Sequence, residues 1–237
     1  MDIFTVFLVI ILAAGVQASF QLSVSIFTLI SGHKISQRLP HRKIMKLSTA
    51  MVLGVFITNI LLFSALAFWM SGLSNIFASN FKAFWAGAIG LLAGVSVASW
   101  IFYYKKGKNT GTEIWLPRNF AHYLSQKTKT SEHSAEAFSL GAGSVLAEIL
   151  FIFPLLFSAV LATTMVSTAW QFVALTTYVF IANFPLFVVY CLISGGHNLS
   201  QIQIWREQNQ RFLKLFASLG AILLSVIIWA GFLGVSK

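Results

Sequence analysis

Six long apolar stretches constrain the fold of this chain more than any other feature of its sequence. A helix needs about 20 residues to cross the roughly 30 Å hydrocarbon core of a bilayer. With 57% hydrophobic and only 9% charged residues, the chain lacks the polar sequence to cover a water-soluble surface. We therefore predict an all-α integral membrane protein with six transmembrane helices. The expected spans are residues 3–30, 48–70, 83–104, 137–164, 170–193 and 212–235.

Two segments of the chain occur twice, in the same order. Residues 55–63 and 179–187 share six of nine residues at a spacing of 124, and residues 96–100 recur in part at 225–229. A unit of three spans reverses its direction when it is repeated, so we expect two inverted three-helix repeats, as in many transporters. The first and fourth spans are the longest, and each is expected to be tilted, broken or partly re-entrant. The predicted division is a first repeat at 1–104, a cytoplasmic basic and interfacial loop at 105–136, and a second repeat at 137–237.

The lysines and arginines predict the orientation of the chain. The loops after the first, third and fifth spans carry five, six and three of them, whereas the other two loops carry only Lys82. Positively charged loops stay on the cytoplasmic side, so both termini are predicted to be extracytoplasmic in a multi-pass protein of the plasma membrane. The same rule accounts for most of the net charge of +10. We therefore expect contact with anionic lipid head groups and no binding of nucleic acid.

The loop at 105–136 mixes aromatic and basic residues around Pro117. This mixture favours a short helix in the head-group layer, and an ordinary connector is the alternative. The lone Cys191 supplies neither an intramolecular disulfide nor a C-x-x-C pair. We predict no cofactor and no metal site.

Glu148 is the only ionisable carboxylate well within a predicted span. A charge near the middle of a helix costs about 3 kcal/mol on insertion scales, so this side chain should face the protein interior, a cavity or a partner. Gly141 and Ser144 share its helix face, and Pro154 should bend or interrupt the helix six residues later. A carboxylate beside loosened carbonyls suits a cation or proton site. The alternative is that Glu148 snorkels outward or pairs with a loop lysine.

A polar stripe runs along the first predicted span at intervals of four, four and three residues: Gln17, Gln21, Ser25 and Thr28. Aligning the repeats at a spacing of 127 makes Gln21 the counterpart of Glu148. Such a stripe either lines an aqueous pathway or bonds neighbouring helices together, at about 0.6 kcal/mol per contact. The sequence leaves both readings open.

Asn59 and Asn183 occupy equivalent positions in the repeated segment, so they should reach similar depths from opposite directions. A buried amide in lipid needs a hydrogen-bonding partner or a cavity. Pro185 follows Asn183 closely and should break that helix, whereas the first repeat has no such proline. The alternative role is structural hydrogen bonding across the two-fold axis.

His33 and His197 each follow a glycine where an odd-numbered span meets the cytoplasm. Capping of the helix ends is the simplest role for these segments. The other readings are a cytoplasmic gate or a weak metal contact, which lacks the further ligands of a secure site.

The layout of two inverted triplets resembles the LysE and DsbD-transmembrane group of small six-helix transporters. This resemblance implies export of a small solute or ion, or electron transfer across the membrane. The chain has no paired intramembrane cysteines, which removes electron transfer, and its first span lacks the Gly-Pro signature of amino-acid exporters.

The predicted function is transport or export of a small solute or cation by alternating access. Glu148 would be the coupling or cation-binding carboxyl, beside Ser144, and the path would be lined by Gln17, Gln21, Asn59 and Asn183. The alternative is a non-transport membrane scaffold that binds partners through its basic loops. An enzyme is disfavoured, because one acid without an intramembrane histidine or cysteine is a poor catalytic set. Whether the chain forms a homo-oligomer is left open.

Overall fold

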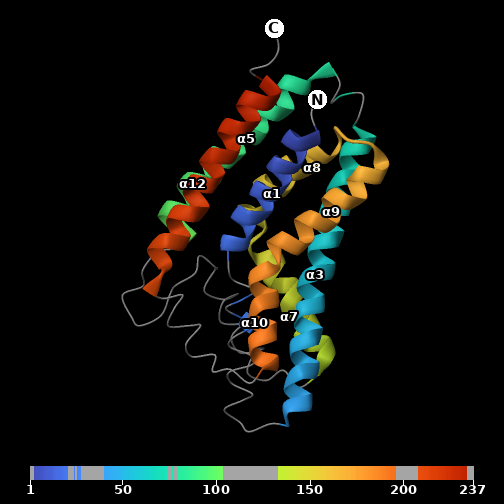
Figure 1. Ribbon diagram of the computed structural model, residues 1–237, viewed down its shortest axis with the longest axis vertical. Coiled ribbons are helices and arrows are strands. Elements are labelled where there is room, and N and C mark those ends of the chain that lie inside the picture. Colours follow the sequence, from blue (N-terminus) through green and yellow to red (C-terminus); the bar gives the residue numbers. More distant parts are fainter. Residues whose placement is uncertain are drawn as a thin grey trace.

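The computed structural model describes residues 3–20, 24, 26–27, 40–73, 76, 79–103, 133–195 and 208–233. Every regular element within these residues is a helix (Figure 1). The elements are α1 (Ile3–Ser19), α3 (His41–Gly72), α5 (Phe81–Ala98), η1 (Ser99–Tyr103), α7 (Ser134–Ala147), α8 (Ile149–Thr163), α9 (Thr168–Ala182), α10 (Phe184–Ser194), α12 (Gln210–Ile228) and η2 (Trp229–Leu233). The elements η1 and η2 are π-helices, and each directly follows a long α-helix.

Three helical segments are long and apolar enough to cross a membrane on their own: His41–Gly72, Phe81–Ile101 and Arg211–Leu233. Two helix pairs pass the same test together but are bent, α7–α8 by 76° and α9–α10 by 55°. The described residues therefore support three to five of the six predicted spans. The expectation of a broken fourth span is confirmed. The α1 helix has only 17 residues, which falls short of a full crossing.

The first span was expected at residues 3–30, with its helix tilted, broken or partly re-entrant. The α1 helix ends at Ser19, where the backbone N–H of Phe20 bonds the carbonyl of Gln17 at 3.0 Å, and residues 24, 26 and 27 beyond it are again helical. The second was expected to begin at residue 48, whereas α3 begins at His41, directly after Pro40. Exposed basic side chains in the first turns of α3 made this part of the helix look like a loop in the sequence.

The chain runs back and forth along the long axis of the molecule (Figure 1). The helices α1, α5 and α9–α10 run from the upper to the lower end of the view, and α3, α7–α8 and α12 run upward. The start of α1 and the end of η2 both lie at the upper end. Of the described lysines and arginines, five belong to the helix starts at the lower end and one, Lys82, to the start of α5 at the upper end. The five are Arg42, Lys43 and Lys46 on α3 and Arg211 and Lys214 on α12.

The helices α3 and α7 pack backbone against backbone. A Cβ atom on Gly54 would overlap the carbonyl oxygen of Phe138, and one on Gly141 would overlap the carbonyl oxygen of Met51. Each glycine thus lies in the groove of the other helix. Small residues are favoured at such crossings because lipid provides no hydrophobic drive, and association then depends on close packing.

The helices α5 and α12 form an antiparallel pair that lies beside the other helices (Figure 1). The hydroxyls of Ser96 and Ser218 are 2.9 Å apart, and Trp85 stacks on Phe232 with ring centroids 3.8 Å apart. Trp85 is fully buried, and its indole N–H has no hydrogen-bond partner among the described residues. At the opposite end of the pair, the Lys214 ammonium lies 4.4 Å from the centre of the Trp100 ring.

Candidate functional site

Four buried polar side chains from three spans form one chain of hydrogen bonds. The Tyr178 hydroxyl on α9 donates to Oε1 of Gln17 on α1. The Gln17 Nε2 donates to Oδ1 of Asn59 on α3 at 3.1 Å, and the Asn59 Nδ2 donates to Oδ1 of Asn183 at 2.9 Å. The Asn183 Nδ2 donates in turn to the carbonyl oxygen of Val179 at 2.7 Å. None of the four polar side chains is more than 6% exposed.

This amide chain, made of Tyr178, Gln17, Asn59 and Asn183, begins and ends on α9. Each of its three amides both accepts and donates a hydrogen bond, so the neighbours fix the orientation of every amide. A polar group left unpaired in an apolar interior is costly. These hydrogen bonds therefore stabilise one particular arrangement of α1, α3 and the α9–α10 junction. Three residues that the sequence placed on one path therefore do meet in space. Their lining a path for solute stays a prediction.

The two asparagines that are equivalent in the repeat bond directly to each other. One turn earlier, Phe56 and Phe180, also 124 residues apart, meet edge to face with ring centroids 6.2 Å apart. Residues related by a two-fold axis touch their own counterparts only near that axis. The crossing of α3 and α9 is therefore the place where such an axis would pass.

Asn183 is the residue at which the fifth span bends. It is both the C-cap of α9 and the N-cap of α10. Its backbone N–H bonds the carbonyl of Val179 at 3.2 Å. Pro185 lies in the first turn of α10, where a missing N–H does no harm. The same proline cannot donate to the carbonyl of Ile181, so α9 cannot continue without a defect.

Glu148 occupies the corresponding place in the fourth span, between α7 and α8. Its side chain is buried, with 6% of its surface exposed. Its backbone N–H bonds the carbonyl of Val145 at 3.1 Å, while its carbonyl accepts from Phe151 and Ile152 at 2.8 and 3.0 Å. Glu148 thus lies at a 76° bend, with its side chain buried in the protein.

The residues predicted around Glu148 behave differently from one another. Ser144 is fully buried, and its hydroxyl donates to the carbonyl of Gly141 at 2.7 Å. The prediction that the helix breaks at Pro154 is wrong, because Pro154 lies inside α8 and the break falls six residues earlier. This proline removes only the backbone bond to the carbonyl of Leu150, and α8 continues through it to Thr163.

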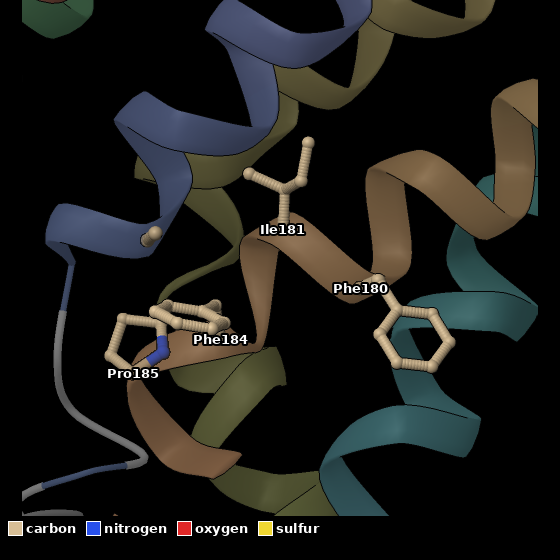
Figure 2. Close-up of a pocket in the computed structure, with 5 residues that line it drawn as sticks. Phe180, Ile181, Phe184 and Pro185 are labelled. Atoms are coloured by element: carbon tan, nitrogen blue, oxygen red, sulfur yellow. The ribbon is translucent and has the colours of Figure 1, made fainter. Parts of the chain in front are cut away.

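An open pocket of about 370 Å³ lies where the fifth span bends (Figure 2). It is lined by Ala18 at the end of α1 and by Phe180, Ile181, Phe184 and Pro185 around the bend. Figure 2 shows Ile181 pointing toward α1 and Phe180 toward α3. The side chains that line this pocket are all apolar, and Glu148 is not among them. It is therefore not the polar cavity expected around that carboxyl.

Tyr178 was not predicted as part of the site. It is the counterpart of Gly54 in the repeat, and its ring packs against Phe63 with centroids 5.2 Å apart. A signal was available, since a tyrosine in the middle of an apolar span must find a hydrogen-bond partner for its hydroxyl. The spacing of five residues to Asn183 gave no indication of which partner it would take.

Three predicted site residues, Gln21, His33 and His197, lie outside the described residues, as does most of the interfacial loop at 105–136. Within the part of the chain that the structure describes, no three His, Cys, Asp or Glu side chains come close enough to hold a metal ion. Cys191 is exposed on α10.

Comparisons with protein-family models, with curated proteins and with solved structures find no match to this chain. The fold and the site therefore define its class by themselves. It is an all-helical protein with apolar helices of membrane-spanning length, two of them bent at buried polar residues.

Proposed function

We propose that the protein is a multi-pass plasma-membrane transporter or exporter that moves a small solute or cation by alternating access. The observation that carries this proposal is that two apolar spans bend at a buried polar residue, Glu148 in one and Asn183 in the other. Discontinuous helices with polar groups at their breaks form the substrate and ion sites of many transporters. Such breaks are tolerated at membrane depth only inside protein or beside water.

The bounds of the helices support the inverted repeat. The ends of α1 and α7, at Ser19 and Ala147, are 128 residues apart, close to the spacing of 127 used in the sequence alignment. A shift of 124 places the bounds of α3 at residues 165–196, which enclose the α9–α10 pair. The starts of α5 and α12 are 129 residues apart, and both helices end in a π-helix of five residues. Three successive spans thus correspond in order.

The direction of the helices supports a two-fold axis in the membrane plane. The equivalent helices α3 and α9 run in opposite directions (Figure 1) and meet through two pairs of counterparts, the asparagines and the phenylalanines. The two halves are not identical, however. Gly220 of α12 lies against Val16 of α1, whereas α5 makes no comparable contact with α7 within the described residues.

The basic end of the bundle would face the cytoplasm, in contact with anionic lipid head groups, and both termini would be extracytoplasmic. The test uses a Cys191→Ser background with single cysteines at Ser167, at the upper end, and at Arg211, at the lower end. A membrane-impermeant maleimide added to intact cells should label position 167 and not position 211. The reverse pattern would overturn this orientation.

In this proposal Glu148 is the coupling or cation-binding group, with Ser144 in the preceding turn of α7. The amide chain holds α1, α3 and α9 in register. The C-terminal end of α7 and the N-terminal end of α8 meet at Glu148, so partial charges of opposite sign lie on the two sides of this residue. Export of a small solute or ion is what the resemblance to the LysE and DsbD-transmembrane layout implies.

The transport test uses purified protein in liposomes that contain the pH dye pyranine. Gradients of Na⁺, K⁺ and a panel of small zwitterionic and cationic solutes are imposed in turn, and internal pH and radiotracer uptake are recorded. Wild type should couple one of these gradients to uptake or proton movement, and Glu148→Gln should abolish the coupling. The matched control is Glu136→Gln, the same change in the first turn of α7. Unchanged coupling in Glu148→Gln would remove the carboxyl from the mechanism.

A non-transport scaffold is the second candidate, and one observation favours it. The amides of the chain are already hydrogen-bonded within the protein, and the pocket at the bend is apolar. Both features are expected of a densely packed assembly subunit. A water-soluble carbodiimide with glycine ethyl ester separates the two candidates. A transporter should admit the reagent to Glu148, which mass spectrometry would detect as a modified carboxyl. Protection of Glu148 together with modification of the more accessible Glu136 favours the scaffold.

A further inference from the structure

We propose that Asn59 and Asn183 form an exchangeable pair whose hydrogen bond reverses when the protein switches between two states. In the observed state α9–α10 is bent at Asn183, and α3 is a continuous helix through Asn59. In the other state α3 bends at Asn59, and α9–α10 straightens. This inference rests on the inverted repeat of the proposed function and adds the device by which its two halves exchange shape.

The hydrogen bonds of the observed state define what the reversal requires. Asn59 donates to Asn183, and Asn183 donates to the carbonyl of Val179, four residues earlier on its own helix. In the reversed state Asn183 donates to Asn59, and Asn59 donates to the carbonyl four residues earlier on α3. That carbonyl belongs to Val55, the repeat counterpart of Val179. The same residue types are therefore in place for both directions.

The Gln17 side chain does not prevent the exchange. It donates to Oδ1 of Asn59, and a carbonyl oxygen has two lone pairs, so Asn59 can accept from Gln17 and Asn183 together. The reversed state removes the donor that Oδ1 of Asn183 has in the observed state. The observed state is therefore the favoured one in the absence of a substrate.

The helix α3 has a point of weakness at the required place. The Thr58 hydroxyl, adjacent to Asn59, donates to the carbonyl of Gly54 at 2.8 Å. Bonds of this kind back to the preceding turn compete with the backbone ladder and bend helices. Gly54 itself lowers the helix propensity of the same turn.

One position in each repeat sets which helix is bent. Pro185 cannot donate to the Ile181 carbonyl, and its counterpart Leu61 keeps its N–H. Exchanging these two residues should therefore move the bend from the fifth span to the second. Because the pair Asn59 and Asn183 lies between them, a change on one helix should be read out on the other.

The test measures the length of both spans by double electron–electron resonance in liposomes, in a Cys191→Ser background. Spin labels at Ala169 and Ser194 report on α9–α10, and labels at Lys46 and Ser71 report on α3; all four side chains are exposed. Each pair is 25 residues apart, so a bend like the 55° of α9–α10 shortens the separation by about 4 Å relative to a straight helix.

Pro185→Leu should populate a state in which the α9–α10 distance is longer by about 4 Å and the α3 distance is shorter by a similar amount. Combining it with Leu61→Pro should make that state dominant. Ala65→Pro, one turn further along α3, is the matched control and should shorten α3 without lengthening α9–α10. Should the double variant not fold, Pro185→Leu alone still decides, since its effect is read on the other helix.

Lengthening of α9–α10 with an unchanged α3 distance would overturn the exchange, as would unchanged distances in both Pro185→Leu and the double variant. The outcome is independent of the transport assay. Coupled distances without transport retain the exchange and remove the proposed function. Transport without coupled distances retains the function and removes the exchange.

Discussion

The helix α3 and the α9–α10 pair contain nearly the same nine-residue segment and differ in shape. The first is a continuous helix of 32 residues, whereas the second is bent by 55° at the asparagine that both share. The difference in sequence that removes a backbone donor is Leu61 in α3 against Pro185 in α10. The repeat thus places equivalent side chains together, and the loss of one backbone donor changes the path of the helix.

A second pair of equivalent positions, Gly54 and Tyr178, also differs between the two halves. Gly54 allows the backbone of α7 to approach α3, and its counterpart Tyr178 fills that space on α9 and reaches Gln17 on α1. Equivalent positions therefore support a close helix crossing in one half and a polar contact in the other. An internal repeat does not make the two halves functionally equal.

Moving the proline tests the comparison most severely. Leu61→Pro should lower the free energy of unfolding by about 3 kcal/mol, because it breaks the backbone ladder in the interior of a continuous helix. Pro185→Leu should change it much less, and adding it to Leu61→Pro should restore part of the loss. SDS titration in mixed micelles provides the measurement. A similar loss for the two single variants would show that the bend does not depend on the proline.

Gly54→Ala should lower the free energy of unfolding by about 1–3 kcal/mol, because the new methyl group overlaps the Phe138 carbonyl and pushes α7 away. The matched control is Gly87→Ala on α5, where the added methyl group meets open space. That variant should be neutral or stabilising by up to about 1 kcal/mol. Equal effects in the same micelle titration would mean that α3 and α7 are not closely packed.

Replacing either asparagine should leave a different number of polar groups without hydrogen-bond partners. Asn59→Leu removes the partners of both Gln17 and Asn183 and should cost about 1–3 kcal/mol. Asn183→Leu leaves only the Asn59 donor unpaired within the amide chain, since the Val179 carbonyl keeps the backbone N–H of residue 183. We expect roughly half the loss of stability there. A larger effect for Asn183→Leu would argue against the observed direction of the bonds.

Tyr178→Phe should have the smallest effect, about 1 kcal/mol, because it removes one hydroxyl and leaves the Gln17 carbonyl without its donor. Tyr190→Phe is the control, since its hydroxyl meets Thr49 at an exposed site, and it should change the stability by less than about 0.5 kcal/mol. Identical unfolding curves for both variants would indicate that Gln17 has another donor.

The sequence located most of the polar residues that the structure brings together, for identifiable reasons. Asn59 and Asn183 were found by the repeat, and Gln17 by helical periodicity on an apolar span. Glu148 was found because a carboxylate in such a span is costly and needs compensation. Tyr178 was missed because its partner is 161 residues away in the sequence. The break near Pro154 was misplaced, because α8 continues through this proline and the chain bends at Glu148 instead.

By itself the sequence determined the all-helical class, the apolar segments and the positions of the polar residues within them. These depend on local composition and periodicity, because each spanning helix needs its own run of apolar residues and forms its own backbone hydrogen bonds. Only the tertiary structure decided that α1 stops at Ser19, that the fourth span bends at Glu148 rather than at Pro154, and that the amides bond in one direction. Those features arise where several helices meet, because a break in a helix or a buried amide is stable only when a neighbouring span supplies the missing packing and hydrogen bonds.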